Sequence, residues 1–162
     1  MKYITLTQGK VAIVSDRDYI YLSQWKWCYK RNEKTKGGYA IRRGPRPERR
    51  YISIHQTVAR RMNMMGRVDH RNRNELDNRR CNLRVCNLSQ NQGNSHMRKN
   101  NTSGYRGVSR SRNATKWLAQ ITIHGVNKCL GHFDDKVAAA LAYNTAARKH
   151  FGKFATLNRI SP

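Results

Sequence analysis

An acid, a histidine and two asparagines stand at spacings that suit one divalent metal ion and one activated water. Asp69 and His70 are adjacent, Asn82 follows twelve residues after the histidine, and Asn91 lies nine residues further on. Carboxylate and amide oxygens suit Mg²⁺ or Mn²⁺, which makes Asp69 and Asn91 the candidate metal ligands. An imidazole has a pKa of about 6.5, suited to a general base at neutral pH. Either Asn82 or the peptide carbonyl of His70 is a candidate to orient the ring. This set predicts hydrolysis of a phosphodiester.

The charge balance indicates which polyanion such a site would cut. The chain of 162 residues has 33 Lys and Arg against 9 Asp and Glu, a formal net charge of +24. A surface of this kind attracts nucleic acid through counterion release. The sequence contains no long apolar run, no basic amphipathic helix of useful length and no signal-peptide pattern at its start. We therefore expect double-stranded DNA as the partner, no membrane, and an intracellular location rather than secretion.

Basic residues are concentrated around the candidate site. The range 42–99 holds 15 Lys and Arg and 4 acids, a balance of +11. A charge run is usually a solvated surface, but this one surrounds a candidate phosphate-cutting site. We therefore expect contacts to backbone phosphates, which position DNA without reading its sequence. The expected phosphate contacts are Arg71, Arg73, Arg79, Arg80 and Arg84.

The cysteines favour free thiols in a reducing cytosol over structural zinc. Cys28, Cys81, Cys86 and Cys129 form no CxxC pair. Cys81 and Cys86, with His96 downstream, have poor spacing for a zinc site.

The order of expected elements predicts an α+β chain in several small modules. In the range 1–54, alternating residues and turn signals predict a β-rich module. Its expected strands lie at 3–6, 10–14, 25–29, 39–43 and 51–54, with a short helix at 19–22 capped near Ser15. The pattern leaves open whether these strands read a DNA groove or support the candidate site.

The range 55–94 carries the candidate site. A helix is expected at 55–62 and a strand that begins at Val68 and delivers Asp69 and His70. A polar loop of about twelve residues and a returning strand at 83–86 follow. Ser89 is the expected cap of a short helix that carries Asn91.

The rest of the chain reads as a basic linker, 95–103, and a C-terminal domain, 104–160. Three strands are expected at 105–108, 117–123 and 128–133, followed by an alanine-rich helix at 135–150 capped by Asp134. Gly152 stands just past the end of that helix, as in many helix termini.

The motifs of the second range resemble the HNH nuclease family. Asp69-His70, Leu76-Asp-Asn78, Asn82-Leu-Arg84 and Ser89-Gln-Asn91 carry the likeness. The resemblance implies a ββα-metal (His-Me finger) core, in which Asp69 and Asn91 bind metal and His70 is the general base. Asn82 would support the histidine loop, and Asn78 would add a loop or DNA contact. Asparagine at 91 resembles the phage and intron-encoded branch, and phage origin would place the protein in a bacterial cytoplasm.

Residues 102–158 resemble the Apetala-type (ethylene-response-factor) DNA-binding domain. Tyr105-Arg-Gly-Val108, Leu130-Gly131 and Ala142-Tyr-Asn144 are among the matching elements. The resemblance implies that a three-stranded sheet enters the major groove with the helix packed behind it. The positions that would face DNA are Arg106, Arg110, Arg112, Gln120 and Thr122. Several of these differ from the family's residues, so its base specificity does not transfer.

Together these features predict a site-directed DNA endonuclease of the homing type. The range 55–94 would cut with one Mg²⁺ or Mn²⁺ ion, and the C-terminal sheet would select the site. One metal per active site implies one strand cut, so a monomer would nick and a double-strand cut would need a dimer or a second visit. A non-catalytic DNA-binding regulator with a relic HNH fold is the main alternative, and an RNA-directed protein ranks last.

Overall fold

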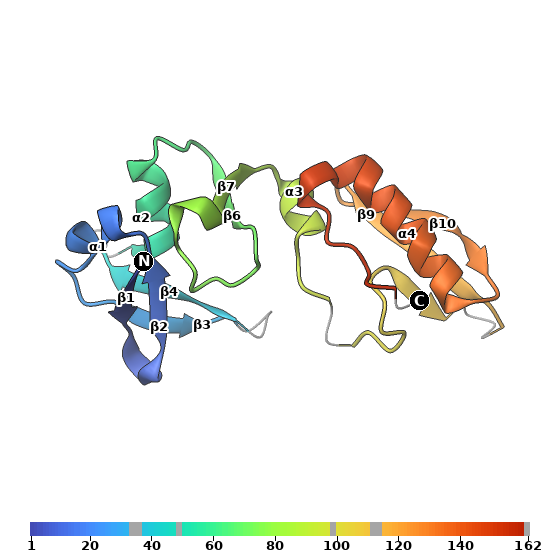
Figure 1. The fold of residues 1–162 in the computed structure, drawn as a ribbon, viewed down its shortest axis with the longest axis horizontal. Helices are drawn as coiled ribbons and strands as arrows, with labels where there is room; N and C mark the ends of the chain where they lie inside the picture. Colours follow the sequence, from blue (N-terminus) through green and yellow to red (C-terminus); the bar gives the residue numbers. More distant parts are fainter. Residues whose placement is uncertain (33–36, 48–49, 98–99, 111–114, 161–162) are drawn as a thin grey trace. The chain divides into compact units, whose positions relative to one another are not determined.

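A computed structural model describes residues 1–32, 37–47, 50–97, 100–110 and 115–160. These residues form a mixed α+β structure with four small antiparallel sheets and four α-helices (Figure 1). The chain divides into two compact units, Met1–Cys86 and Asn87–Pro162, and each is described by itself. Within the described ranges, no helix combines the length and apolar character that a membrane span needs.

The first unit contains three of the sheets and two helices. In chain order its elements are β1 (Lys2–Thr5), β2 (Val11–Val14), α1 (Asp16–Leu22), β3 (Cys28–Arg31), β4 (Gly38–Arg43), β5 (Tyr51–Ser53), α2 (Ile54–Arg61), β6 (Arg67–His70) and β7 (Leu83–Cys86). Short 3-10 turns lie at Thr7–Gly9 and Arg80–Asn82. The sheets pair as β1-β2, β3-β4-β5 and β6-β7.

One hydrophobic core holds the first unit together. Val14 and Leu22 come from the expected β-rich module, whereas Val58 and Leu83 come from the range expected to cut, and all four are almost completely buried. Burying such side chains is the dominant favourable term in folding. The β6-β7 hairpin therefore depends on the preceding strands for its packing.

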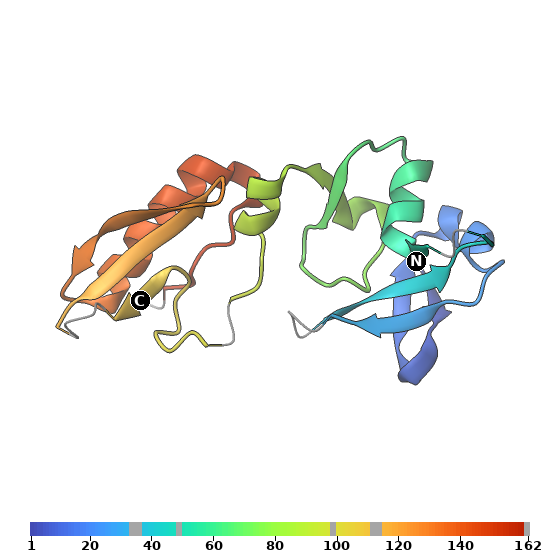
Figure 2. The same cartoon turned by 180° about the vertical axis from the view of Figure 1, so that it is seen from behind.

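The second unit is a three-stranded sheet packed on one long helix. Its elements are α3 (Leu88–Gly93), β8 (Val108–Arg110), β9 (Trp117–Ile123), β10 (Val126–Phe133), α4 (Lys136–Phe151) and a 3-10 turn at Gly152–Phe154. The strand order is β10-β9-β8, and Figure 2 shows β9 and β10 in front of α4. Ala119 and Ala139 are both fully buried, because small side chains let the helix lie close to the sheet. The expected C-terminal arrangement of sheet and helix is thus confirmed.

The segment expected as a linker belongs to the second unit where it is described. Ser103 is buried, and its hydroxyl donates to the carbonyl of Val108 at 2.7 Å. The guanidinium of Arg106 donates to the hydroxyl and carbonyl of Ser95. Polar side chains therefore fasten this segment to the start of the sheet.

Several expected element boundaries were wrong, each for a local reason. The strand expected at 25–29 begins at Cys28, because the indole of Trp27 donates to Leu22 at 2.8 Å and is buried beside α1. The strand expected at 105–108 begins at Val108, since Gly107 has φ +70° and turns the chain.

The caps of two helices also lie one or two residues from the expected positions. Asn87, rather than Ser89, caps α3, and it forms a reciprocal capping box with Gln90. Asp135, rather than Asp134, caps α4 by accepting from the amide of Ala138.

Candidate active site

The β6-β7 hairpin positions Asp69 and His70. In the antiparallel register Asp69 faces Arg84 and His70 faces Leu83. Asp69 is 8 % exposed and His70 is 6 % exposed. Strand geometry sends adjacent side chains to opposite faces, so the two neighbours meet different partners.

Asp69 is paired with a buried guanidinium. Nε and Nη2 of Arg84 lie 3.0 Å and 2.9 Å from the same carboxylate oxygen, Oδ2. Opposite residues of an antiparallel pair lie close on one face, which explains the contact. Arg84, expected to contact phosphate, thus lies against the expected metal ligand.

His70 faces the amide of Asn78. Nε2 of His70 lies 3.4 Å from Oδ1 of Asn78, and Nδ2 of Asn78 donates to the carbonyl of Leu76 at 3.0 Å. This second bond sets the orientation of the amide, so its oxygen faces the imidazole. This arrangement suits the neutral tautomer with its proton on Nε2, in which Nδ1 is the unprotonated nitrogen.

Burial makes the neutral imidazole the stable form. Desolvation lowers the pKa of His70. This effect outweighs the hydrogen bond that the ring donates to Asn78 and the nearby carboxylates of Glu75, Asp69 and Asp77, all of which raise the pKa. A neutral ring at pH 7 is the form able to accept a proton from water.

A second histidine packs against His70. The ring centroids of His55 and His70 are 5.2 Å apart with the planes at 72°, and the ring of Tyr39 lies 5.4 Å from that of His55. Burial, followed by repulsion from His70, lowers the pKa of His55 to about 3. The sequence left open whether His55, at the start of the expected helix, contacts phosphate or has a structural role, and it is the fold that brings α2 beside β6.

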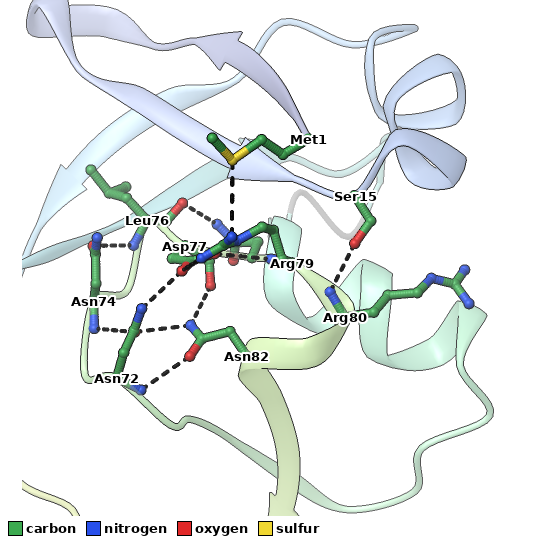
Figure 3. A network of polar contacts seen from close by, with 10 residues as sticks. Met1, Ser15, Asn72, Asn74, Leu76, Asp77, Arg79, Arg80 and Asn82 are labelled. Carbon is green, nitrogen blue, oxygen red and sulfur yellow. Dashed lines mark hydrogen bonds and ion pairs between the residues drawn. The ribbon is translucent and has the colours of Figure 1, made fainter.

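Asn82 organises the loop between β6 and β7 (Figure 3). Its Oδ1 accepts from the amide of Asn72 at 3.0 Å, and its Nδ2 donates to Asn72 Oδ1 at 2.9 Å and to the carbonyl of Asp77 at 2.7 Å. Asn72 and Arg79 in turn bind the Asp77 carboxylate. Asn82 therefore supports the histidine loop, while the side chain that faces His70 Nε2 belongs to Asn78.

The loop is also attached to the N-terminal hairpin. The amide of Ile13 donates to the carbonyl of Leu76 at 2.8 Å, and the amide of Asn78 donates to the carbonyl of Ile13 at 2.7 Å. Ile13 and Asp77 form a parallel β-bridge. The partner of His70 is thus held by the backbone of β2.

Arg80 joins the end of the loop to helix α1. Nε and Nη2 of Arg80 each lie 2.7 Å from an oxygen of Asp18, and Arg61 Nε lies 2.9 Å from the same carboxylate. The hydroxyl of Ser15 accepts from the amide of Arg80 at 3.0 Å. Burial raises the pKa of Asp18, but the two arginines outweigh it, and the pKa is lowered. Sequence analysis did not foresee this buried carboxylate.

The five arginines expected at phosphates fall into two groups. Arg79, Arg80 and Arg84 have carboxylate partners in Asp77, Asp18 and Asp69. Arg71 is exposed, and Arg73 is half-buried with φ +62°. Contact between any of the five and DNA stays a prediction.

Asn91 lies in the second unit. It is half-buried on helix α3, and its backbone amide donates to the carbonyl of Asn87. Because Asp69 belongs to the first unit, a shared metal site for the two stays a prediction from the sequence.

The expected DNA-facing residues of the second unit lie on or beside its sheet. Gln120 is exposed on β9 and Thr122 is half-buried two positions on, so both project from the face opposite α4. Arg110 lies over the ring of Trp117 at 4.1 Å, and Arg106 binds Ser95. Arg112 falls outside the described residues.

The donor set suits a hard, weakly held cation. The described residues contain no cluster of three or more His, Cys, Asp or Glu side chains arranged for a metal. Asp69 is a buried carboxylate that already lies against a cationic group. A carboxylate oxygen is a ligand type that Mg²⁺ or Mn²⁺ accepts, and metal binding at Asp69 stays a prediction.

No protein-family model and no solved structure matches this chain.

Proposed function

We propose that this chain is a metal-dependent DNA endonuclease whose cutting site lies in the first unit. The observation that carries the proposal is the buried pair Asp69-His70 with Asn78 Oδ1 facing His70 Nε2. A surface histidine is solvated and free to rotate, whereas this ring is buried and packed between the amide of Asn78 and the ring of His55. The net charge of +24 supports a nucleic-acid substrate.

In the proposed reaction, Nδ1 of His70 accepts a proton as a water attacks the scissile phosphate. The new bond joins the water oxygen to phosphorus, the bond from phosphorus to the 3′ oxygen breaks, and that oxygen takes a proton from solvent. A divalent ion held by Asp69 would neutralise charge on the phosphate and on the departing oxygen. Asn78 keeps the imidazole in the required tautomer, and Asn82 keeps the loop that presents Asn78 in shape.

The second unit would hold the DNA. A three-stranded sheet with exposed polar residues fits the major groove in width. Gln120 and Thr122 project from its open face, and Arg110 lies at the edge strand β8. These residues would contribute site selection, whereas the arginines of the first unit would contribute contact with phosphates.

Conversion of supercoiled DNA tests the proposal. Wild-type protein, His70→Ala and His150→Ala are incubated with supercoiled plasmid carrying a candidate target locus, with Mg²⁺ or Mn²⁺ and with EDTA. His150 is an exposed histidine at the end of α4, so its removal controls for loss of an imidazole. We expect metal-dependent nicked or linear product from wild type and His150→Ala and none from His70→Ala. DNA that is retarded but uncut by all three proteins would support the regulator instead.

A further inference from the structure

The contact between Arg84 and Asp69 places a cation where the proposed metal would bind. Two nitrogens of one guanidinium lie within 3.0 Å of Oδ2 of Asp69. The side chains are 8 % and 9 % exposed respectively, so water screens the pair poorly. A divalent ion on that oxygen and a guanidinium at the same oxygen would repel each other strongly.

A buried ionised carboxylate is costly unless a cation or hydrogen-bond donors compensate it. Removing one member of a buried ion pair leaves an uncompensated charge, which is strongly unfavourable. In this structure Arg84 supplies that compensation for Asp69, and a second cation on the same oxygen could take its place. Arginine also binds phosphate well, because its planar fork matches two phosphate oxygens.

We propose that Arg84 is an internal competitor for the divalent metal on Asp69, displaced when the metal loads. This inference rests on the proposed function, since it assumes that Asp69 binds the metal. Arg84 neutralises Asp69 in the free protein and weakens metal binding there. In the complex, a DNA phosphate would hold the released guanidinium, so substrate and metal would favour each other's binding.

A purely structural role for the ion pair predicts the opposite result. If Arg84 only braces the hairpin, its removal would loosen β6 and β7 and leave metal binding unchanged or weaker. Competition predicts tighter metal binding after its removal. The two interpretations are therefore distinguished by whether the dissociation constant for the metal falls or does not fall when Arg84 is removed.

The test measures Mn²⁺ binding to the full chain without DNA, by titration calorimetry. The variants are Arg84→Met, Arg67→Met and Asp69→Asn. Arg67 is an exposed arginine on β6, two residues from Asp69, and its substitution removes the same charge without touching Oδ2. We expect Arg84→Met to bind Mn²⁺ on the order of tenfold more tightly than wild type, a typical size for a coupling between sites. Arg67→Met should stay within about twofold of wild type, and Asp69→Asn should abolish binding.

Thermal unfolding with and without Mn²⁺ gives a second readout. Arg84→Met should unfold at a lower temperature than wild type without metal and gain more from Mn²⁺, because the ion then neutralises Asp69. If Arg84→Met does not fold without metal, Arg84→Lys replaces it in the titration. Lysine keeps the positive charge but lacks the planar guanidinium. We therefore expect Arg84→Lys to bind Mn²⁺ more tightly than wild type, by less than tenfold.

The outcomes separate the inference from the proposed function. Binding to Arg84→Met that is no tighter than to Arg67→Met, but is lost in Asp69→Asn, would overturn competition and leave the metal site intact. Absence of Mn²⁺ binding in all variants, or equal binding in Asp69→Asn and wild type, would overturn the metal site and with it both proposals.

Discussion

Asp18→Asn should destabilise the first unit far more than its position on a short surface helix implies. Asp18 is 0 % exposed and accepts hydrogen bonds from Arg80 and Arg61. Breaking a buried ion pair by removing one partner costs about 3–5 kcal/mol. The arginine side chains here are 22 % and 34 % exposed, so water recovers part of the loss. We expect about 2–4 kcal/mol in the free energy of unfolding.

Urea unfolding followed by tryptophan fluorescence measures this change in one unit alone. The chain has three tryptophans, of which Trp25 and Trp27 lie in the first unit and Trp117 in the second. In a Trp117→Phe background, the signal reports only the first unit. Each variant is compared with that background by linear extrapolation.

Asp16→Asn is the matched control. Asp16 also lies on α1, but it is exposed, and its carboxylate lies 3.0 Å from the amino group of Met1. An exposed pair of this kind contributes about 0–1 kcal/mol.

The pH dependence gives a second check. The arginines lower the pKa of Asp18, so its contribution is present above the unfolded pKa and is lost as pH falls through the folded one. The difference in unfolding free energy between Asp18→Asn and the background should therefore become smaller at acidic pH. If Asp18→Asn costs no more than Asp16→Asn at pH 7, the assignment of Asp18 as an anchor for the loop is refuted.

Three other substitutions test separate parts of the structure. Gly107→Ala should cost about 3 kcal/mol or more in the second unit, because a Cβ there would lie 2.5 Å from the carbonyl of Gln120. Gly125 also has a positive φ but lies in open space, so Gly125→Ala should cost about 1 kcal/mol. Equal losses of unfolding free energy in the two variants, measured by urea unfolding, would exclude the clash at Gly107. His55 has a pKa of about 3 when folded and 6.5 in its ordinary state, so it destabilises the fold as pH falls below the ordinary value. Between pH 7.5 and 5, His55→Gln should reduce the slope of the unfolding free energy against pH by the equivalent of up to about one proton taken up on unfolding. An unchanged slope would argue against the burial of His55. Asn82→Ala removes three hydrogen bonds of the loop and should cost about 2–3 kcal/mol. It should abolish nicking while gel retardation persists, and full nicking by a folded variant would contradict its role.

The sequence predicted those features that local pattern determines. The C-terminal strand at 117–123 was predicted from its alternating residues, and the helix after Asp135 from its alanine-rich run. Each pattern can be recognised within a single strand or helix. The spacing of Asp69 and His70 from Leu83 gave the hairpin that carries them. Boundaries failed where a single tertiary contact decided them, as the indole of Trp27 does.

The partners of the site residues lay beyond sequence reasoning. His55 and Asn78 meet His70, and Arg84 meets Asp69, through the packing of α2, the loop and β7. Asp18 is one of nine acids, and no local pattern marks it as the partner of an arginine 62 residues away. Conformational pairing over such distances depends on the whole core.

The bridge between Ile13 and the loop has a consequence for biosynthesis. Ile13 precedes the peptide groups that it pairs with, at Leu76 and Asn78, by more than sixty residues. Contacts between residues so far apart in the sequence form slowly, because the entropy of loop closure is lost before the contacts can stabilise the fold. Under the proposed function, a nascent chain would therefore gain cutting activity in one step, once the β6-β7 hairpin has emerged, rather than in proportion to its length.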